Sequence, residues 1–142
     1  MSGVSGVLVL VGRILFSSLF AMAGINHIKR QEMMLGYAAS ARFPQPYLAG
    51  WPAGIWLLAG AVSLALGVWP DIGVLMIGLF VVLAASYFHR FWEIQDQAQR
   101  QMQMQLFFRN VIALGASLAL FGFFAAAGEG LRFTITEPLF NF

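Results

Sequence analysis

The stretch that decides the fold is "WPAGIWLLAGAVSLALGVWPDIGVLMIGLFVVLAASYF", residues 51–88, which holds one charged side chain, Asp71. It divides into two apolar segments, residues 51–69 and 72–88. The sequence Trp-Pro-Asp lies between them. Proline lacks an amide hydrogen and cannot continue a helix, and aspartate is a good helix cap. The stretch therefore predicts a tight hairpin of two apolar helices.

Two further apolar segments flank this hairpin. Residues 4–25 form one, interrupted by Arg13, and residues 106–127 form the other, with Arg109 in its first turn. A helix crosses the hydrocarbon core of a membrane with about 20 apolar residues, and it satisfies its own backbone hydrogen bonds. The pattern predicts an all-α, transmembrane four-helix bundle. We expect one domain over residues 1–142, with spans at about 4–25, 51–69, 72–88 and 106–127.

The composition agrees with a membrane protein. Of the 142 residues, 60% are hydrophobic and 10% are charged, against roughly 45–50% and 25% in soluble domains. A soluble chain of this kind would expose large apolar patches. The absence of cysteine excludes disulfides, thiolate metal sites and cysteine nucleophiles. The small net charge of +2 gives no reason to expect a nucleic-acid partner.

The basic residues predict an orientation in the membrane. The two long links between spans, residues 26–50 and 89–105, carry Lys29, Arg30, Arg42, Arg90 and Arg100. The other side of the membrane would carry Arg132 alone. Because cytoplasmic loops are enriched in Lys and Arg, we expect the long links in the cytoplasm and both termini outside it.

Short interfacial helices are expected on the cytoplasmic side. Residues 87–110, "YFHRFWEIQDQAQRQMQMQLFFRN", are mostly polar, but Phe91, Ile94, Ala98 and Met102 recur at helical spacing. They predict an amphipathic surface helix that leads into the last span, with an ion pair between Asp96 and Arg100. A second short helix is expected from Gln31 to the two prolines that precede the second span.

Arg13 is the most unusual residue within a span. A charge at membrane depth costs about 2.5–3.5 kcal/mol on insertion scales, so the side chain should face the bundle interior, a cavity or a partner. One interpretation is an anion or headgroup site. The other is a structural pairing with polar groups and carbonyls of a neighbouring helix. The two middle segments carry no acid within their apolar runs, and both interpretations stay open.

The remaining polar groups give no enzyme signature. His27 and His89 lie at one membrane boundary, but too few ligand-type side chains surround them to predict a metal or haem site. Hydrolase, metalloprotease, nucleotide-binding and dinucleotide-binding motifs are absent.

Small residues at Gly115 and Gly122 in the last span, and at Gly60 in the second, predict close helix contacts.

Four segments, in order and spacing, resemble those of the DoxX family of small bacterial membrane proteins. They are "GRILFSSLFAMAGINHI" (12–28), "YAASARFPQPYLAG" (37–50), "SYFHRFW" (86–92) and "QLFFRNVIALGASLAL" (105–120). The resemblance implies a four-helix bundle in the bacterial inner membrane, often linked to oxidoreductase systems such as thiosulfate–quinone oxidation. Many relatives carry a glutamate in the second span, where this chain has "LLAGAVSLALG" (57–67) without an acid.

The family's polar pattern supplies the candidate ligand- or partner-binding residues: Arg13, Asn26, His27, His89, Trp92, Arg109 and Asn110. No catalytic residue is predicted. The expected function is a non-catalytic accessory subunit of a larger inner-membrane complex for transport or redox chemistry. Two alternatives remain: a quinone-linked oxidoreductase subunit, with Arg13, His27 and His89 lining one pocket, and a lipid-binding membrane protein. The oligomeric state stays open.

Overall fold

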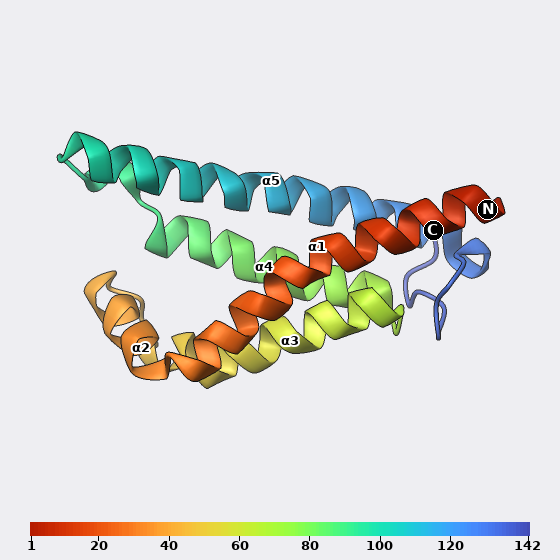
Figure 1. The fold of residues 1–142 in the computed structure, drawn as a ribbon, viewed down its shortest axis with the longest axis horizontal. Helices are drawn as coiled ribbons and strands as arrows, with labels where there is room; N and C mark the ends of the chain where they lie inside the picture. The colour runs from red at the N-terminus through yellow and green to blue at the C-terminus, as the bar shows by residue number, and fades with distance from the viewer.

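The computed structural model describes all residues from 1 to 142, and it is entirely helical with connecting loops. Its four long helices are α1 (Gly3–Lys29), α3 (Trp51–Leu66), α4 (Pro70–Phe88) and α5 (Gln97–Ala127). Helix α3 packs between α1 and α4, and α4 packs in turn against α5 (Figure 1). The predicted all-α four-helix bundle is confirmed.

The short elements lie at the two ends of the bundle. At one end, which we call the loop end, are α2 (Gln31–Ser40) and the 3-10 helices η1 (Pro46–Ala49) and η2 (Phe91–Glu93). At the other, which we call the hairpin end, are the α3–α4 turn, η3 (Gly128–Gly130) and both termini (Figure 1).

The surface of the bundle is apolar, as lipid requires. Large side chains point outward along its length, for example Leu8 and Leu15, each 68% exposed, and Ile112, 72% exposed. Helices α1, α4 and α5 are long and apolar enough to cross a membrane. Helix α3 is as apolar but has 16 residues, which corresponds to about 24 Å at 1.5 Å per residue. The chain is a multi-pass membrane protein.

The turn between α3 and α4 differs from the expected one. Helix α3 ends at Leu66, not at residue 69, because Gly67 adopts a left-handed conformation (φ +71°) that ends the helix. Pro70 is the first residue of α4 instead of the residue that stops α3. The prediction that Asp71 caps α4 is wrong, because its Oδ2 accepts a hydrogen bond from the Phe140 amide at 2.7 Å.

The predicted amphipathic surface helix is also wrong in its extent. Phe91 lies in η2 and Ile94 is extended, so they do not share a helix with the later apolar residues. Helix α5 begins at Gln97 and runs without a break into the span (Figure 1). Asp96 caps it by accepting from the Gln99 amide at 3.0 Å. The predicted Asp96–Arg100 ion pair does not form, since this carboxylate serves the helix end.

Close helix contacts occur at Gly60, as expected, but not at the glycines of the last span. A Cβ atom placed on Gly115 or Gly122 would meet nothing within 4 Å, so the predicted stripe on the last span does not pack. The close approach joins α1 to α3 instead. A Cβ on Gly24 would lie 2.8 Å from the carbonyl oxygen of Gly54. Gly60 does pack closely, on α4, where its Cβ would lie 3.1 Å from the oxygen of Gly73.

The C-terminal tail, residues 131–142, covers the hairpin end. The amides of Ile135 and Thr136 both donate to the Gly67 oxygen at 3.0 Å. The Trp69 amide donates to Thr136 Oγ1 at 2.8 Å. Together with the Asp71–Phe140 bond, these contacts attach the tail to the α3–α4 turn, whose backbone groups would otherwise lack partners.

Candidate functional site

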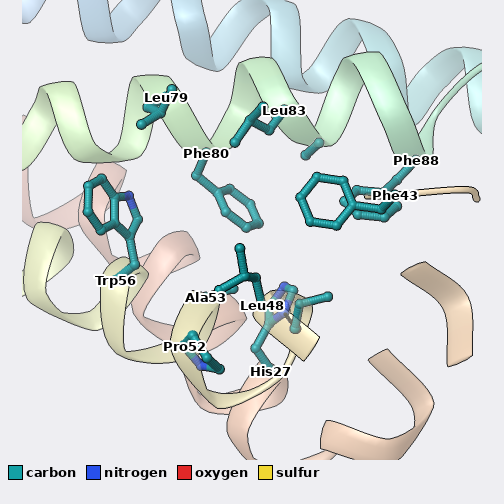
Figure 2. A pocket seen from close by; sticks show the side chains of 12 residues that line it. His27, Phe43, Leu48, Pro52, Ala53, Trp56, Leu79, Phe80, Leu83 and Phe88 are labelled. Carbon is teal, nitrogen blue, oxygen red and sulfur yellow. Dashed lines mark hydrogen bonds between the residues drawn. The ribbon is translucent and has the colours of Figure 1, made fainter. Parts of the chain in front are cut away.

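A cavity of about 280 Å³ lies between α3 and α4 towards the loop end (Figure 2). Twelve residues line it, and ten of them are hydrophobic. They come from α1, from the α2–α3 connection, from α3 and from α4: His27, Phe43, Leu48, Ala49, Pro52, Ala53, Trp56, Leu79, Phe80, Leu83, Ala84 and Phe88. An apolar lining with a single ionisable side chain is typical of a small-molecule site.

The cavity exists because α3 and α4 meet closely at one end only. Near the hairpin, Gly60 and Gly73 let the two backbones approach. Farther along, Trp56 of α3 reaches across to α4, and its Nε1 donates to the Met76 oxygen at 2.8 Å. Beyond this bond the large ring of Phe80 stands between the helices (Figure 2). The space at the loop end is therefore bounded by aromatic rings.

His27 is the ionisable group of the cavity. Helix α1 places it near its own C-terminal end, where Nδ1 is within hydrogen-bond distance of the Ala49 oxygen. The edge of one ring meets the face of the other between His27 and Phe80, with centroids 5.5 Å apart. Because a carbonyl oxygen can only accept, we assign the proton to Nδ1. In the neutral ring this leaves Nε2 as an acceptor.

The segment that carries α2 and η1 closes the loop end of the cavity. Phe43 packs against Phe88, with centroids 5.5 Å apart. Tyr37 donates its hydroxyl to the Phe88 oxygen at 2.8 Å. Burial raises the pKa of Tyr37 above its ordinary value, so the hydroxyl stays protonated and able to donate. Arg90 adds a bond from Nη2 to the Ala41 oxygen.

Arg13 lies at the opposite end of the bundle from His27. Its partners include Leu64 in the last turn of α3, whereas His27 bonds Ala49, just before that helix begins. About 15 residues at 1.5 Å each separate these levels by roughly 20 Å. His89 lies outside the cavity as well. The predicted pocket lined by Arg13, His27 and His89 together is therefore wrong.

The Arg13 guanidinium is fully buried and hydrogen-bonded to backbone oxygens. Nε donates to Leu64 at 3.0 Å, and Nη2 donates to Ala65 at 3.0 Å and to Phe133 at 2.8 Å. Nη1 lies 3.5 Å from the Arg132 oxygen. The last carbonyls of a helix have no partner within it and carry a partial negative charge. Arg13 therefore caps α3 from a neighbouring helix and holds the tail to it.

The other candidate residues are placed away from the cavity. His89 follows the last residue of α4 and shares a hydrogen bond of 2.8 Å with Gln103 of α5. Asn110 is buried and donates to the Leu106 oxygen. The remaining three lie at the surface: Asn26, Trp92 and Arg109. No three side chains of His, Asp or Glu come together in a way that could hold a metal ion.

Sequence reasoning missed most of the cavity lining and the role of the tail. Trp56 and Phe80 lie in segments that are apolar on every face of the helix, so the sequence did not indicate which face is buried. A signal for the tail did exist in Asp71, the one charged residue among the 38 residues from 51 to 88, because a buried carboxylate requires a donor from elsewhere.

Residues 8–90 match the family model of DoxX. The chain belongs to the DoxX family. The matched region runs from α1 to the end of α4, so it contains every residue that lines the cavity. The DoxX resemblance noted within α5 lies beyond the matched residues. The comparisons with curated proteins and with solved structures gave no match.

Proposed function

We propose that this DoxX family protein is a non-catalytic membrane protein that binds an acyl chain of a lipid in the α3–α4 cavity. The observation that carries the proposal is the apolar lining of this cavity, with His27 as its one ionisable side chain. Leu79 and Trp56 of the lining are 52% and 40% exposed on the lipid-facing surface. A chain already dissolved in the bilayer can therefore enter from the side, and its dispersion contacts supply the binding energy.

A quinone fits the same cavity less well. A quinone ring presents two carbonyl oxygens at opposite edges, and each is stabilised by a hydrogen-bond donor. The cavity offers His27, whose Nδ1 is engaged by Ala49, and Trp56, whose Nε1 is engaged by Met76. Because both of these N–H donors are used within the protein and the remaining His27 Nε2 is an acceptor, the lining favours an acyl chain.

Filling the cavity tests this function. The protein would be purified in mild detergent, and the lipid that it retains would be counted by native mass spectrometry. Ala53→Phe places a ring in the cavity, and Ala59→Phe places the same ring on the exposed face of the same helix. We expect one retained lipid in the wild type and in Ala59→Phe, and loss of most of it in Ala53→Phe. Equal retention in all three proteins would refute the proposal, as would stoichiometric quinone in an organic extract.

An accessory role in a larger inner-membrane complex is a second candidate. An aromatic cluster at the loop end favours it: Trp92 packs on Phe107 with centroids 5.7 Å apart, and Phe107 on Phe108 at 5.4 Å. Trp92 and Phe108 are each 50% exposed, and the neighbouring Arg109 is exposed too. Tryptophan and arginine are the residues most enriched at the energetic centres of protein interfaces.

Site-specific crosslinking in native membranes tests the accessory role. A photoreactive residue in place of Trp92 should give one recurrent heavier adduct with a single protein. The same residue at Leu15, which faces lipid from the middle of α1, should give none. Adducts from both positions alike, or from neither, would argue against a docking surface at Trp92.

A further inference from the structure

We propose that the bound lipid is anionic, with its headgroup held by Arg42 and Arg90 at the rim of the cavity. This inference rests on the proposed acyl-chain site and adds the chemical class of its ligand. It goes beyond the candidate residues discussed above, because neither arginine is one of them.

The two arginines stand at the same wall of the cavity. Phe43 and Phe88 form that wall at the loop end, with ring centroids 5.5 Å apart. Arg42 directly precedes Phe43, and Arg90 follows Phe88 by two residues. A hydrogen bond from Arg90 Nη2 to the oxygen of Ala41, the neighbour of Arg42, ties the two chain segments together. Both cations thus lie within two residues of the rings that close the cavity.

Arg42 is free to bind a ligand. It is exposed, and its guanidinium makes no hydrogen bond or ion pair within the protein. Its backbone is left-handed (φ +58°), a conformation that is strained for an L-residue and that glycine adopts without this strain. An arginine at such a position contributes a charge beside the cavity that glycine could not supply.

Arg90 is partly engaged. Its Nη1 lies 3.5 Å from Glu93 Oε1, and this carboxylate is 55% exposed. An ion pair with so exposed a carboxylate is weak, and the Arg90 side chain is itself 25% exposed, so its guanidinium charge stays available at the rim. Glu93 is the acid paired at this rim, so the local charge of Arg42, Arg90 and Glu93 is net positive.

The combination of a cavity and a cationic rim matches an amphiphile. Guanidinium groups bind carboxylates and phosphates through paired, charge-assisted hydrogen bonds. Basic residues at the end of a membrane helix lie at the depth of the lipid headgroups. An acyl chain in the cavity would bring its own headgroup to this rim. The shared chemistry is an anionic amphiphile, and either a phospholipid or a free fatty acid has it.

A competition experiment tests the charge preference. The purified full-length protein would be offered phosphatidylglycerol and phosphatidylcholine with identical chains, and the retained lipids would be counted by native mass spectrometry. We expect the wild type to prefer phosphatidylglycerol by about tenfold. Arg42→Gln should reduce this ratio to near one while the total retained lipid stays similar. Arg100→Gln, an exposed arginine on the α5 extension, should leave the ratio unchanged.

The outcomes separate this inference from the proposed function. Unchanged preference in Arg42→Gln, or no preference in the wild type while Ala53→Phe still loses its lipid, would overturn the anionic site alone. Retention that is insensitive to Ala53→Phe would overturn the acyl-chain site itself. A parallel arm with oleate identifies the source: displacement of phosphatidylglycerol by oleate in the wild type, and not in Arg42→Gln, would support a fatty acid as the ligand.

Discussion

Arg13 donates a hydrogen bond from Nη2 to the backbone oxygen of Phe133, at 2.8 Å and 120 residues later in the chain. The same nitrogen donates to Ala65 at the end of α3. One buried side chain therefore joins three parts of the protein: the first helix, the end of the third and the C-terminal tail. Carbonyl groups surround the charge in place of an acidic counter-ion, which explains how the chain carries an arginine in a span without an acidic partner.

Replacing Arg13 should destabilise the bundle. Arg13→Met leaves the oxygens of Leu64, Ala65 and Phe133 without their donor. Hydrogen bonds to charged groups contribute about 1.5–3 kcal/mol each, and the lower cost of inserting methionine offsets part of the loss. We expect the free energy of unfolding to fall by about 2 kcal/mol. Denaturation in mixed micelles measures it. Arg109→Met, at an exposed position, serves as control, and equal stability of the two variants would contradict the expectation.

The tail should be released when its anchor on α4 is removed. In Asp71→Leu the Phe140 amide loses its acceptor, whereas Asp71→Asn retains a side-chain oxygen at the same place. We expect limited proteolysis to cut the tail after residue 131 several times faster in Asp71→Leu than in the wild type. Asp71→Asn should behave much more like the wild type. Mass spectrometry of the fragments gives the rates, and identical rates in all three proteins would count against the anchor.

The α1–α3 contact should not tolerate a methyl group. A Cβ at Gly24 would lie 2.8 Å from the oxygen of Gly54 and 2.9 Å from Leu58 Cγ, so the helices must move apart. Overpacking of this kind costs about 1–3 kcal/mol. We expect a lower thermal midpoint for Gly24→Ala. Gly115→Ala, where the new atom meets nothing within 4 Å, should keep or slightly raise the midpoint. The prediction fails if the two alanine variants melt alike.

The orientation in the membrane can be tested with single cysteines, because the natural chain has none. Gln99→Cys marks the loop end, and Glu137→Cys marks the tail at the hairpin end. The basic residues of the loop end predict that it faces the cytoplasm. An impermeant maleimide added to intact spheroplasts should therefore label Glu137→Cys, and should label Gln99→Cys only after the membrane is opened. The reverse pattern would invert the orientation.

The helical segments could be predicted, but several of their ends could not. Hydropathy is summed over many residues, so errors of a few positions do not hide a span. The ends depend on single residues: Gly67 ends α3 through its left-handed backbone, and Asp96 starts α5 by capping it. Pro70 and the spacing of apolar residues after Phe91 predicted other helix ends, because more than one nearby residue could end or cap a helix.

The candidate site was predicted only in part. The family pattern pointed to His27, which lines the cavity, but it also pointed to Arg13, which lies at the other end. Sequence position already separates these two by 14 residues along α1, which is about 21 Å at 1.5 Å per residue. It could not show which groups of other helices each side chain meets, because that depends on how those helices pack against α1. The sequence also could not identify Trp56 of α3 or Phe80 of α4 as cavity residues, because most side chains in both segments are apolar.

The amino-acid sequence by itself determined that this protein is a bundle of membrane helices, and that its basic residues gather at one end. Both properties are local, since they follow from the length, hydropathy and charge of continuous segments. Only the tertiary structure decided which groups meet: Arg13 with the end of α3 and the tail, and His27 with Ala49 beside an apolar cavity. These contacts join residues that are 22 to 120 positions apart in the sequence. Whether such residues meet in space depends on the angles and close contacts of the packed helices.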